Sequence, residues 1–288
     1  MTALGDQPTA PPAGLRERVL AAALAARAAG RPTPDAPQIS PVEGFGRAAD
    51  ALDGLLGSLG EDDWHRPVLR DLDVQGLVGH LIGVEEDLQR CLAGDPAVAD
   101  ANHVASTQPA ARRQSGRATG QTRAEWRGAV NDTIRLVKDV NRLGEVVALH
   151  GNRLPLAAQL VVRAFELWTH DNDIRGVRGL PPSVPDASTL RLMTDLAAQL
   201  LPHIAQLTGL QESITMRLVL TGPGGGTWDL ALGPDRPDPS GLRIVTDAVG
   251  FCRLAANRVT PDELDVHVTG DPGQAGVMLA AAAAMAWD

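Results

Sequence analysis

Residues 163–173 read RAFELWTHDND, and this stretch decides both the fold and the site that we expect. It places Glu166 and His170 four residues apart within an apolar-periodic segment that runs from after Asn152 to about Arg175. Such a segment predicts a helix, in which side chains four positions apart lie on one face with Cβ atoms about 5–6 Å apart. Both side chains can therefore reach a single ion.

Three earlier segments show the same helical period and carry helix start signals. The signals are, in order along the chain, Ser40 with Glu43, then Asp73, then Thr122 with Glu125. The four predicted helices cover about residues 40–60, 73–94, 122–140 and 153–175. Residues 95–121 show no clear period, which indicates a mobile or functional segment. A further helix is expected from about residue 186, interrupted at Pro202.

The period changes after residue 210. Ile214, Met216, Leu218 and Leu220 alternate with other side chains, which predicts a strand. TWDLAL, LRIVT and LDVHVTG predict further strands, and helices are expected over residues 247–258 and in the Ala-rich end. We therefore predict an α+β protein of two domains, with an N-terminal extension over 1–39, a four-helix bundle over 40–210 and a small α+β domain over 211–288.

Composition restricts the function classes. The chain has 288 residues, 44% of them apolar, and a net charge of −9 from 35 acidic and 26 basic residues, which argues against nucleic acid as a partner. No window approaches the roughly 18–20 apolar residues of a membrane span, and the start of the chain lacks a signal-peptide pattern, so a cytoplasmic protein is expected. Cys91 and Cys252 are too few for a disulfide framework and are expected to pack as small apolar side chains.

A third candidate ligand, His80, lies in the second predicted helix beside the apolar stripe of Leu77 and Val84, so it is expected to point into the bundle. A buried carboxylate such as Glu166 needs a compensating partner, and a divalent cation is one. Together with His170, these side chains would leave an open coordination position for a substrate. On spacing alone, a surface ion pair and a hydrogen-bonded core histidine remain alternatives.

Other polar features have structural interpretations. GPGGG at 222–226 lacks the GK[ST] of a phosphate-binding loop and predicts a hairpin connection, and no nucleophile-elbow pattern occurs. The acidic residues 85–87 are expected on the solvated face of the second helix. Five histidines have no partner at ligand spacing: His65, His103, His150, His203 and His267.

Two motifs together resemble the mycothiol-dependent maleylpyruvate isomerase family. The first is Trp64 and Pro67 followed by DLDVQGLVGHL, and the second is FELWTHDNDIRG over residues 165–176. FCRLAANR and VHVTGDP resemble the smaller domain of that family, so the resemblance covers about residues 40–286. It implies a DinB-like four-helix bundle in which His80, Glu166 and His170 bind a divalent metal, usually zinc.

The resemblance also implies an activity. Mycothiol would be the thiol cosubstrate, and a metal-bound thiolate would add to a small electrophilic substrate, as in an isomerase or an S-transferase. A metal-dependent hydrolase that uses a bound water, and a non-catalytic metal-stabilised binding or regulatory protein, remain alternatives.

Two further residues take roles from the resemblance. The family uses an arginine of the C-terminal domain toward the anionic intermediate, and Arg258 is the nearest match, with Arg253 as the second candidate; a surface arginine at a helix end is the alternative interpretation. Asp173 either hydrogen-bonds a ligand imidazole or is a solvated acidic residue.

Overall fold

Capping side chains begin two of the long helices, as the sequence predicts. In the computed structural model, which describes residues 14–15, 18, 36–210, 213–232 and 241–286, Ser40 Oγ accepts the backbone N–H of Glu43, and Asp73 Oδ1 accepts that of Gly76. Each cap satisfies a donor that the first helical turn leaves unpaired. Residues 36–288 belong to one compact unit, which is described below, whereas most of the predicted extension 1–39 lies outside the described residues.

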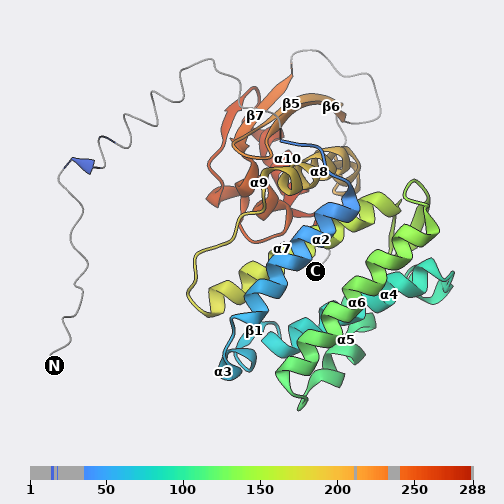
Figure 1. Ribbon diagram of the computed structural model, residues 1–288. Helices are drawn as coiled ribbons and strands as arrows, with labels where there is room; N and C mark the ends of the chain where they lie inside the picture. Colours follow the sequence, from blue (N-terminus) through green and yellow to red (C-terminus); the bar gives the residue numbers. More distant parts are fainter. Residues whose placement is uncertain (1–13, 16–17, 19–35, 211–212, 233–240, 287–288) are drawn as a thin grey trace. The chain divides into compact units, whose positions relative to one another are not determined.

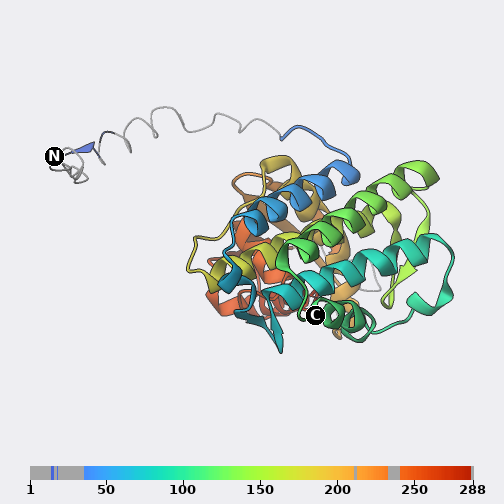
Figure 2. The ribbon, with the colours of Figure 1, turned by 60° about the horizontal axis from the view of Figure 1, so that its bottom comes forward.

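Four helices form the N-terminal bundle (Figure 1): α2 (Pro41–Gly57), α4 (Val74–Leu92), α6 (Thr119–Val140) and α7 (Leu156–Val177). Helix α2 lies against α6 and α7, and α4 lies against α6 and α7. Figure 2 shows the bundle helices running alongside one another. Their core contains Phe45, Leu81, Trp126 and Leu160, which are fully buried. Shorter elements connect them: α3 (Glu61–Trp64), β1 (Pro67–Leu69), β2 (Leu72–Asp73), η1 (Pro96–Val98), α5 (His103–Gln114), β3 (Val146–Leu149) and β4 (Asn152–Pro155).

Two predicted helix starts are wrong. Helix α6 begins at Thr119, three residues before the predicted cap Thr122. The Thr122 hydroxyl does not cap a helix, because it donates to Gln114 Oε1 at 3.0 Å and accepts from Gln75 at 2.9 Å. Helix α7 begins at Leu156, because residues 152–155 pair with β3 as strand β4. In both cases tertiary contacts take up side chains or backbone that local sequence signals assign to a helix start.

The segment 95–121, predicted to be aperiodic, contains helix α5, which packs on α4. The buried residues of α5 are Thr107, Ala110, Ala111 and Gln114, so no large apolar stripe marks this helix in the sequence. Glycines on α4 allow the close approach: a Cβ added at Gly79 would lie 2.7 Å from the Cα of Ala111, and one at Gly83 would lie 2.9 Å from that of Thr107. This close contact with α4 holds α5 at a fixed distance from the bundle.

The β3–β4 hairpin ends in a two-residue turn formed by His150 and Gly151, with φ of 50° and 79°. Positive φ at both positions is what a type I′ hairpin turn requires. The backbone N–H groups of the two residues donate to the carbonyls of Val98 at 2.9 Å and Ala99 at 2.7 Å. The turn is therefore tied to the segment before α5, and this fixes the position of His150.

The C-terminal part contains a four-stranded sheet of order β6-β5-β7-β8, in which β5 and β7 are parallel and the other pairs are antiparallel. Its buried face packs against α8, α9 and α10 (Figure 1). The elements are α8 (Ala187–Leu207), β5 (Ile214–Thr221), β6 (Gly226–Leu232), β7 (Leu242–Asp247), α9 (Ala248–Ala255), η2 (Pro261–Glu263), β8 (His267–Thr269) and α10 (Pro272–Ala283). The predicted fold class, a helical N-terminal domain followed by a smaller α+β domain, is confirmed.

Helix α8 continues through Pro202, where an interruption was expected. Proline inside a helix costs about 3 kcal/mol. Burial of Leu201 and Ile204, 1% and 6% exposed, offsets this cost, since each such side chain contributes about 1.5–3 kcal/mol. These side chains belong to the core around the sheet, although α8 falls in the range predicted for the bundle; the division at residue 210 stays a prediction.

No helix in the described part of the chain has both the length and the apolar character needed to cross a bilayer.

We predict that Gly79→Ala lowers the free energy of unfolding by about 1–3 kcal/mol, because the added methyl group overpacks the contact between α4 and α5. Gly128→Ala is the matched control, since a Cβ at this position of α6 meets nothing within 4 Å. The control should raise the free energy of unfolding by about 0.5–1 kcal/mol. Denaturant titration measures both, and equal stabilisation by the two substitutions would contradict the packing of α5 on α4.

Candidate active site

One face of α7 is polar along about four turns although it points into the protein. Its members are Gln159, Arg163, Glu166, His170 and Asp173, spaced by three or four residues. Arg163 and His170 are each 1% exposed. Buried polar groups must find partners to offset their lost hydration, so this face predicts a polar network within the protein.

The three side chains predicted to bind a metal lie together. Candidate ligand atoms of His80, Glu166 and His170 all lie within 4.8 Å of one another, His80 being contributed by α4 and the other two by α7. The His80 and His170 rings are edge to face, with centroids 5.8 Å apart. The convergence arises because α4 and α7 are neighbours in the bundle.

Outer hydrogen bonds orient both imidazoles toward a common point. The Thr107 hydroxyl donates to the carbonyl of His103, so it accepts from Nδ1 of His80 at 2.7 Å. The carboxylate of Asp173 accepts from Nδ1 of His170 at 3.0 Å. With each Nδ1 acting as donor, both Nε2 atoms present lone pairs to the site.

The Nε2 atom of His170 is buried and has no hydrogen-bond partner among the described residues. Nε2 of His80 lies 3.1 Å from Oε1 of Glu166, where two electron pairs face each other unless a proton or a metal ion lies between them. Burial lowers the pKa of His80 to about 4, so the imidazole is neutral near neutral pH. The donor set therefore fits a divalent cation bound by two imidazoles and a carboxylate.

Both carboxylate oxygens of Glu166 have partners. Its Oε2 accepts from Arg163, and its Oε1 lies 3.3 Å from Nε2 of His103. Burial alone raises the pKa of a carboxyl group, but the charge of Arg163 and the interaction with His103 hold the pKa of Glu166 well below its usual range. The carboxylate is therefore ionised and ready to bind a cation.

Arg163 is itself balanced by Glu85. Its Nε and Nη2 atoms lie 3.1 and 2.7 Å from Oε1 of Glu85, and the two side chains are 2% and 0% exposed. The expectation that residues 85–87 form a solvated acidic face is wrong for Glu85 and Asp87, which are buried, and holds for Glu86, which is 43% exposed.

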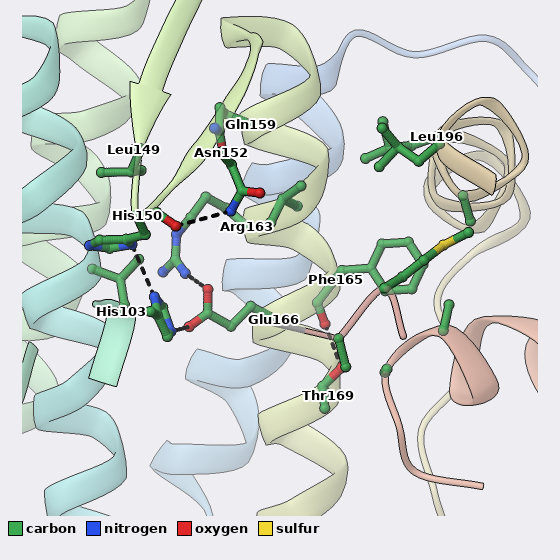
Figure 3. A pocket seen from close by; sticks show the side chains of 18 of the residues that line it. His103, Leu149, His150, Asn152, Gln159, Arg163, Phe165, Glu166, Thr169 and Leu196 are labelled. Atoms are coloured by element: carbon green, nitrogen blue, oxygen red, sulfur yellow. Dashed lines mark hydrogen bonds and ion pairs between the residues drawn. The ribbon is translucent and has the colours of Figure 1, made fainter. Parts of the chain in front are cut away.

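A chain of hydrogen bonds extends from Glu166 through two histidines that the sequence analysis left without partners. Nδ1 of His103 lies 3.0 Å from Nδ1 of His150 (Figure 3). Nε2 of His150 in turn lies 2.9 Å from Oδ2 of Asp87. Between the two carboxylates there are three hydrogen bonds, each of which needs a proton. Two neutral imidazoles supply two protons, so one further proton satisfies the whole chain.

Sequence spacing could not have found this pair, because His103 and His150 are 47 residues apart and both lie outside the predicted helices. One local signal was available. Asn102 caps α5, accepting the backbone N–H of Ala105 at 2.9 Å, and the same pattern in the sequence would have placed His103 at the first position of a helix.

Arg258 lies behind His170, with its guanidinium group bound to Asp173. Its Nε and Nη2 atoms each lie 2.8 Å from an oxygen of that carboxylate. Burial raises the pKa of Asp173, but the hydrogen bonds from His170 and Arg258 outweigh it, so the pKa is lowered from its usual value. Asp173 is thus a partner of a candidate ligand imidazole, the interpretation that competed with a solvated position. The structure connects Arg258 to the site through Asp173. Arg253, Arg258 and Asp173 together line a second groove, separate from the cavity described next.

A cavity of about 930 Å³, its open mouth included, lies beside these side chains. Figure 3 shows His103, His150, Arg163 and Glu166 on one side of it and Leu196 on the other. The polar side comes from α5, α7 and the β3–β4 turn, and the opposite side comes from the C-terminal helices.

Residues 45–175 match the family described as the mycothiol maleylpyruvate isomerase N-terminal domain. This region of the chain belongs to that family. The matched residues contain the bundle helices from most of α2 to nearly all of α7, and with them His80, Glu166 and His170. The resemblance drawn from the two motifs is confirmed.

Two solved structures are similar to this chain. One is a mycothiol-dependent maleylpyruvate isomerase, with 15% identity and a TM-score of 0.54, and the other is that enzyme with a histidine replaced by alanine, with 14% identity and a TM-score of 0.53. Each comparison covers 78% of this chain and 91% of the other. Likeness at this identity shows a shared fold. No curated protein matches the sequence.

We predict that Glu85→Gln lowers the free energy of unfolding by at least about 3 kcal/mol, because it leaves the charge of Arg163 buried with a single carboxylate partner. Glu86→Gln is the matched control: its side chain is 43% exposed and its loss should change stability by less than about 0.5 kcal/mol. Denaturant unfolding of both variants checks this, and similar effects would show that Glu85 is not the counter-charge that we describe.

Proposed function

We propose that the protein is a metal- and mycothiol-dependent enzyme, an isomerase or S-transferase in which a thiolate adds to a small electrophile. The observation that carries the proposal is the pair of Nε2 atoms of His80 and His170 directed with Oε1 of Glu166 at one point beside the cavity. Membership of the N-terminal domain family supports mycothiol as the thiol. His80, Glu166 and His170 would hold the ion, which we propose to be zinc.

A divalent ion at this point would act as a Lewis acid, lowering the pKa of a coordinated thiol from its usual value of about 8.5. The charges of the surrounding side chains suit an anion there. Glu85 and Glu166 contribute two negative charges and Arg163 one positive charge, while Asp173 and Arg258 cancel. One negative charge and a divalent ion leave one positive charge, which a single thiolate neutralises.

We propose that His103 and His150 hold the proton that the thiol releases. The hydrogen-bond chain from Glu166 to Asp87 lacks one proton when both imidazoles are neutral, and it becomes fully satisfied when the pair gains one. The carboxylates at its two ends stabilise the resulting positive charge. A released proton thus has an acceptor at the wall of the cavity, and His103 is the member of the pair that contacts Glu166.

We propose that Arg258 acts as a positioning residue. It fixes the carboxylate of Asp173 with two hydrogen bonds, and Asp173 in turn fixes the ring of His170. Partners of this kind set the orientation and basicity of a metal-binding imidazole. The proposal differs from a direct contact with an anionic intermediate, because Nε and Nη2 of Arg258 bind Asp173 and Nη1 donates to the carbonyl of Ala256.

The proposed function predicts a spectroscopic signature. Cobalt-substituted protein titrated with mycothiol should develop a sulfur-to-cobalt charge-transfer band, and elemental analysis of the purified protein should find about one divalent ion per chain. His170→Ala should abolish both the band and the bound metal. His203→Ala, at an exposed position of α8, is the control and should retain both.

Bound metal without a thiol band would overturn the thiol chemistry and favour hydrolysis or binding. Absence of stoichiometric metal would remove the basis of the whole proposal. Glutathione in place of mycothiol tests the identity of the thiol, and an equal response to both would contradict specificity for mycothiol.

The role of Arg258 predicts a change in metal affinity. Arg258→Ala should weaken metal binding about 10–100-fold, because the support of His170 through Asp173 is lost. Arg253→Ala is the matched control, since Arg253 lines the same groove as Arg258 and lies in helix α9, which ends before Arg258. Competition with a chromogenic chelator measures both affinities. Unchanged affinity with reduced turnover in Arg258→Ala would instead favour a direct role with the substrate.

A further inference from the structure

The cavity beside the candidate metal ligands has one apolar wall. Residues of α8, the end of α9 and the chain after α10 build it, together with two side chains of α7. Its members are Val162, Phe165, Leu196, Ala197, Leu200, Ala255, Ala256 and Met285. A ligand that reaches from the metal site into the cavity must therefore place part of its surface against hydrocarbon, which favours an apolar group there.

The charged groups of the cavity are already neutralised. Among the described residues that line it, Arg163 is the sole arginine or lysine, and Nε, Nη1 and Nη2 of its guanidinium group contact Glu85 or Glu166. Arg258 is bound to Asp173 and lines a separate groove. A carboxylate in the cavity would lose hydration without gaining a cation from the side chains around it, and this is costly.

A neutral hydrogen-bonding group lies on the polar side. Gln159 lines the cavity, is 3% exposed, and its Nε2 atom has no hydrogen-bond partner among the described residues. It lies seven residues before Glu166 on the same helix, about 10 Å along the axis. A buried amide without a protein partner is suited to a ligand group such as a carbonyl, which accepts a hydrogen bond and carries no charge.

We propose, resting on the function proposed above, that the second substrate is an uncharged carbonyl compound with an apolar body, rather than a dicarboxylate. Its body lies against Leu196, Leu200 and Phe165, and an oxygen atom away from the metal ligands accepts from Gln159. The similar solved enzymes are named after maleylpyruvate, which is a charged keto acid. The cavity of this chain suits a substrate without a carboxylate charge.

The test uses two probes that lack the activated carbon–carbon double bond needed for thiol addition and differ in one charge and one methyl group: methyl 4-oxo-4-phenylbutanoate and the 4-oxo-4-phenylbutanoate anion. Binding to metal-loaded, thiol-free protein is measured by calorimetry. We expect the ester to bind at least about ten-fold more tightly than the anion, a difference of about 1.4 kcal/mol. An anion that binds as tightly as the ester, whether through the wall or through the metal, overturns the inference, and so does a failure of both probes to bind.

Two variants of α8 locate the effect. Leu200→Arg adds a cation to the apolar wall and should reduce the preference for the ester at least about ten-fold, whereas Leu207→Arg, at a position that is 70% exposed and does not line the cavity, should keep it. An unchanged preference in folded Leu200→Arg places the binding elsewhere and overturns the inference. If that variant does not fold, the comparison of the probes in the unaltered protein decides.

The result is independent of the thiol. Because no thiol is present, loss of the cobalt charge-transfer band would overturn the proposed function while leaving the probe preference measurable. A band together with equal binding of the two probes would retain the proposed function and overturn only the substrate class.

Discussion

The Glu166 carboxylate is the group on which the site depends. It is 13% exposed between two helices and ionised, so it needs compensating partners, and the protein supplies Arg163 on one oxygen and imidazoles of His80 and His103 near the other. Each partner then needs its own support: Glu85 for Arg163, Thr107 for His80, and His150 for His103. The polar network of the bundle is therefore the consequence of placing one anion in its interior.

The sequence predicted the long elements because their signals are local. The caps at Ser40 and Asp73 and the alternation from Ile214 to Leu220 correspond to real helices and a strand. Helix α5 escaped prediction because its buried face consists of Ala, Thr and Gln side chains that match the glycines of α4, and complementarity between two distant segments leaves no period in either. The start of α7 was predicted too early for a similar reason, because residues 152–155 pair with β3 in a hairpin.

The same distinction separates the parts of the site. Glu166 and His170 share a helix, and His80 lies on an apolar-periodic segment, so all three could be named before the structure was known. His103 and His150 lie on α5 and on a hairpin turn, and they meet through contacts that no spacing encodes. Glu85 and Asp87 were placed on the wrong face because acidic side chains on a helix are usually solvated, whereas here each has a buried cationic or imidazole partner.

The two sides of the cavity belong to different hydrophobic cores: Leu149 packs in the core of the bundle, whereas Leu196 and Met285 pack in the core around the sheet. Substitutions on α8 can therefore reshape the space available to a ligand without disturbing the groups around Glu166. In evolutionary terms the polar network and the apolar wall are separable modules, so substitutions can accumulate in one while the other is kept.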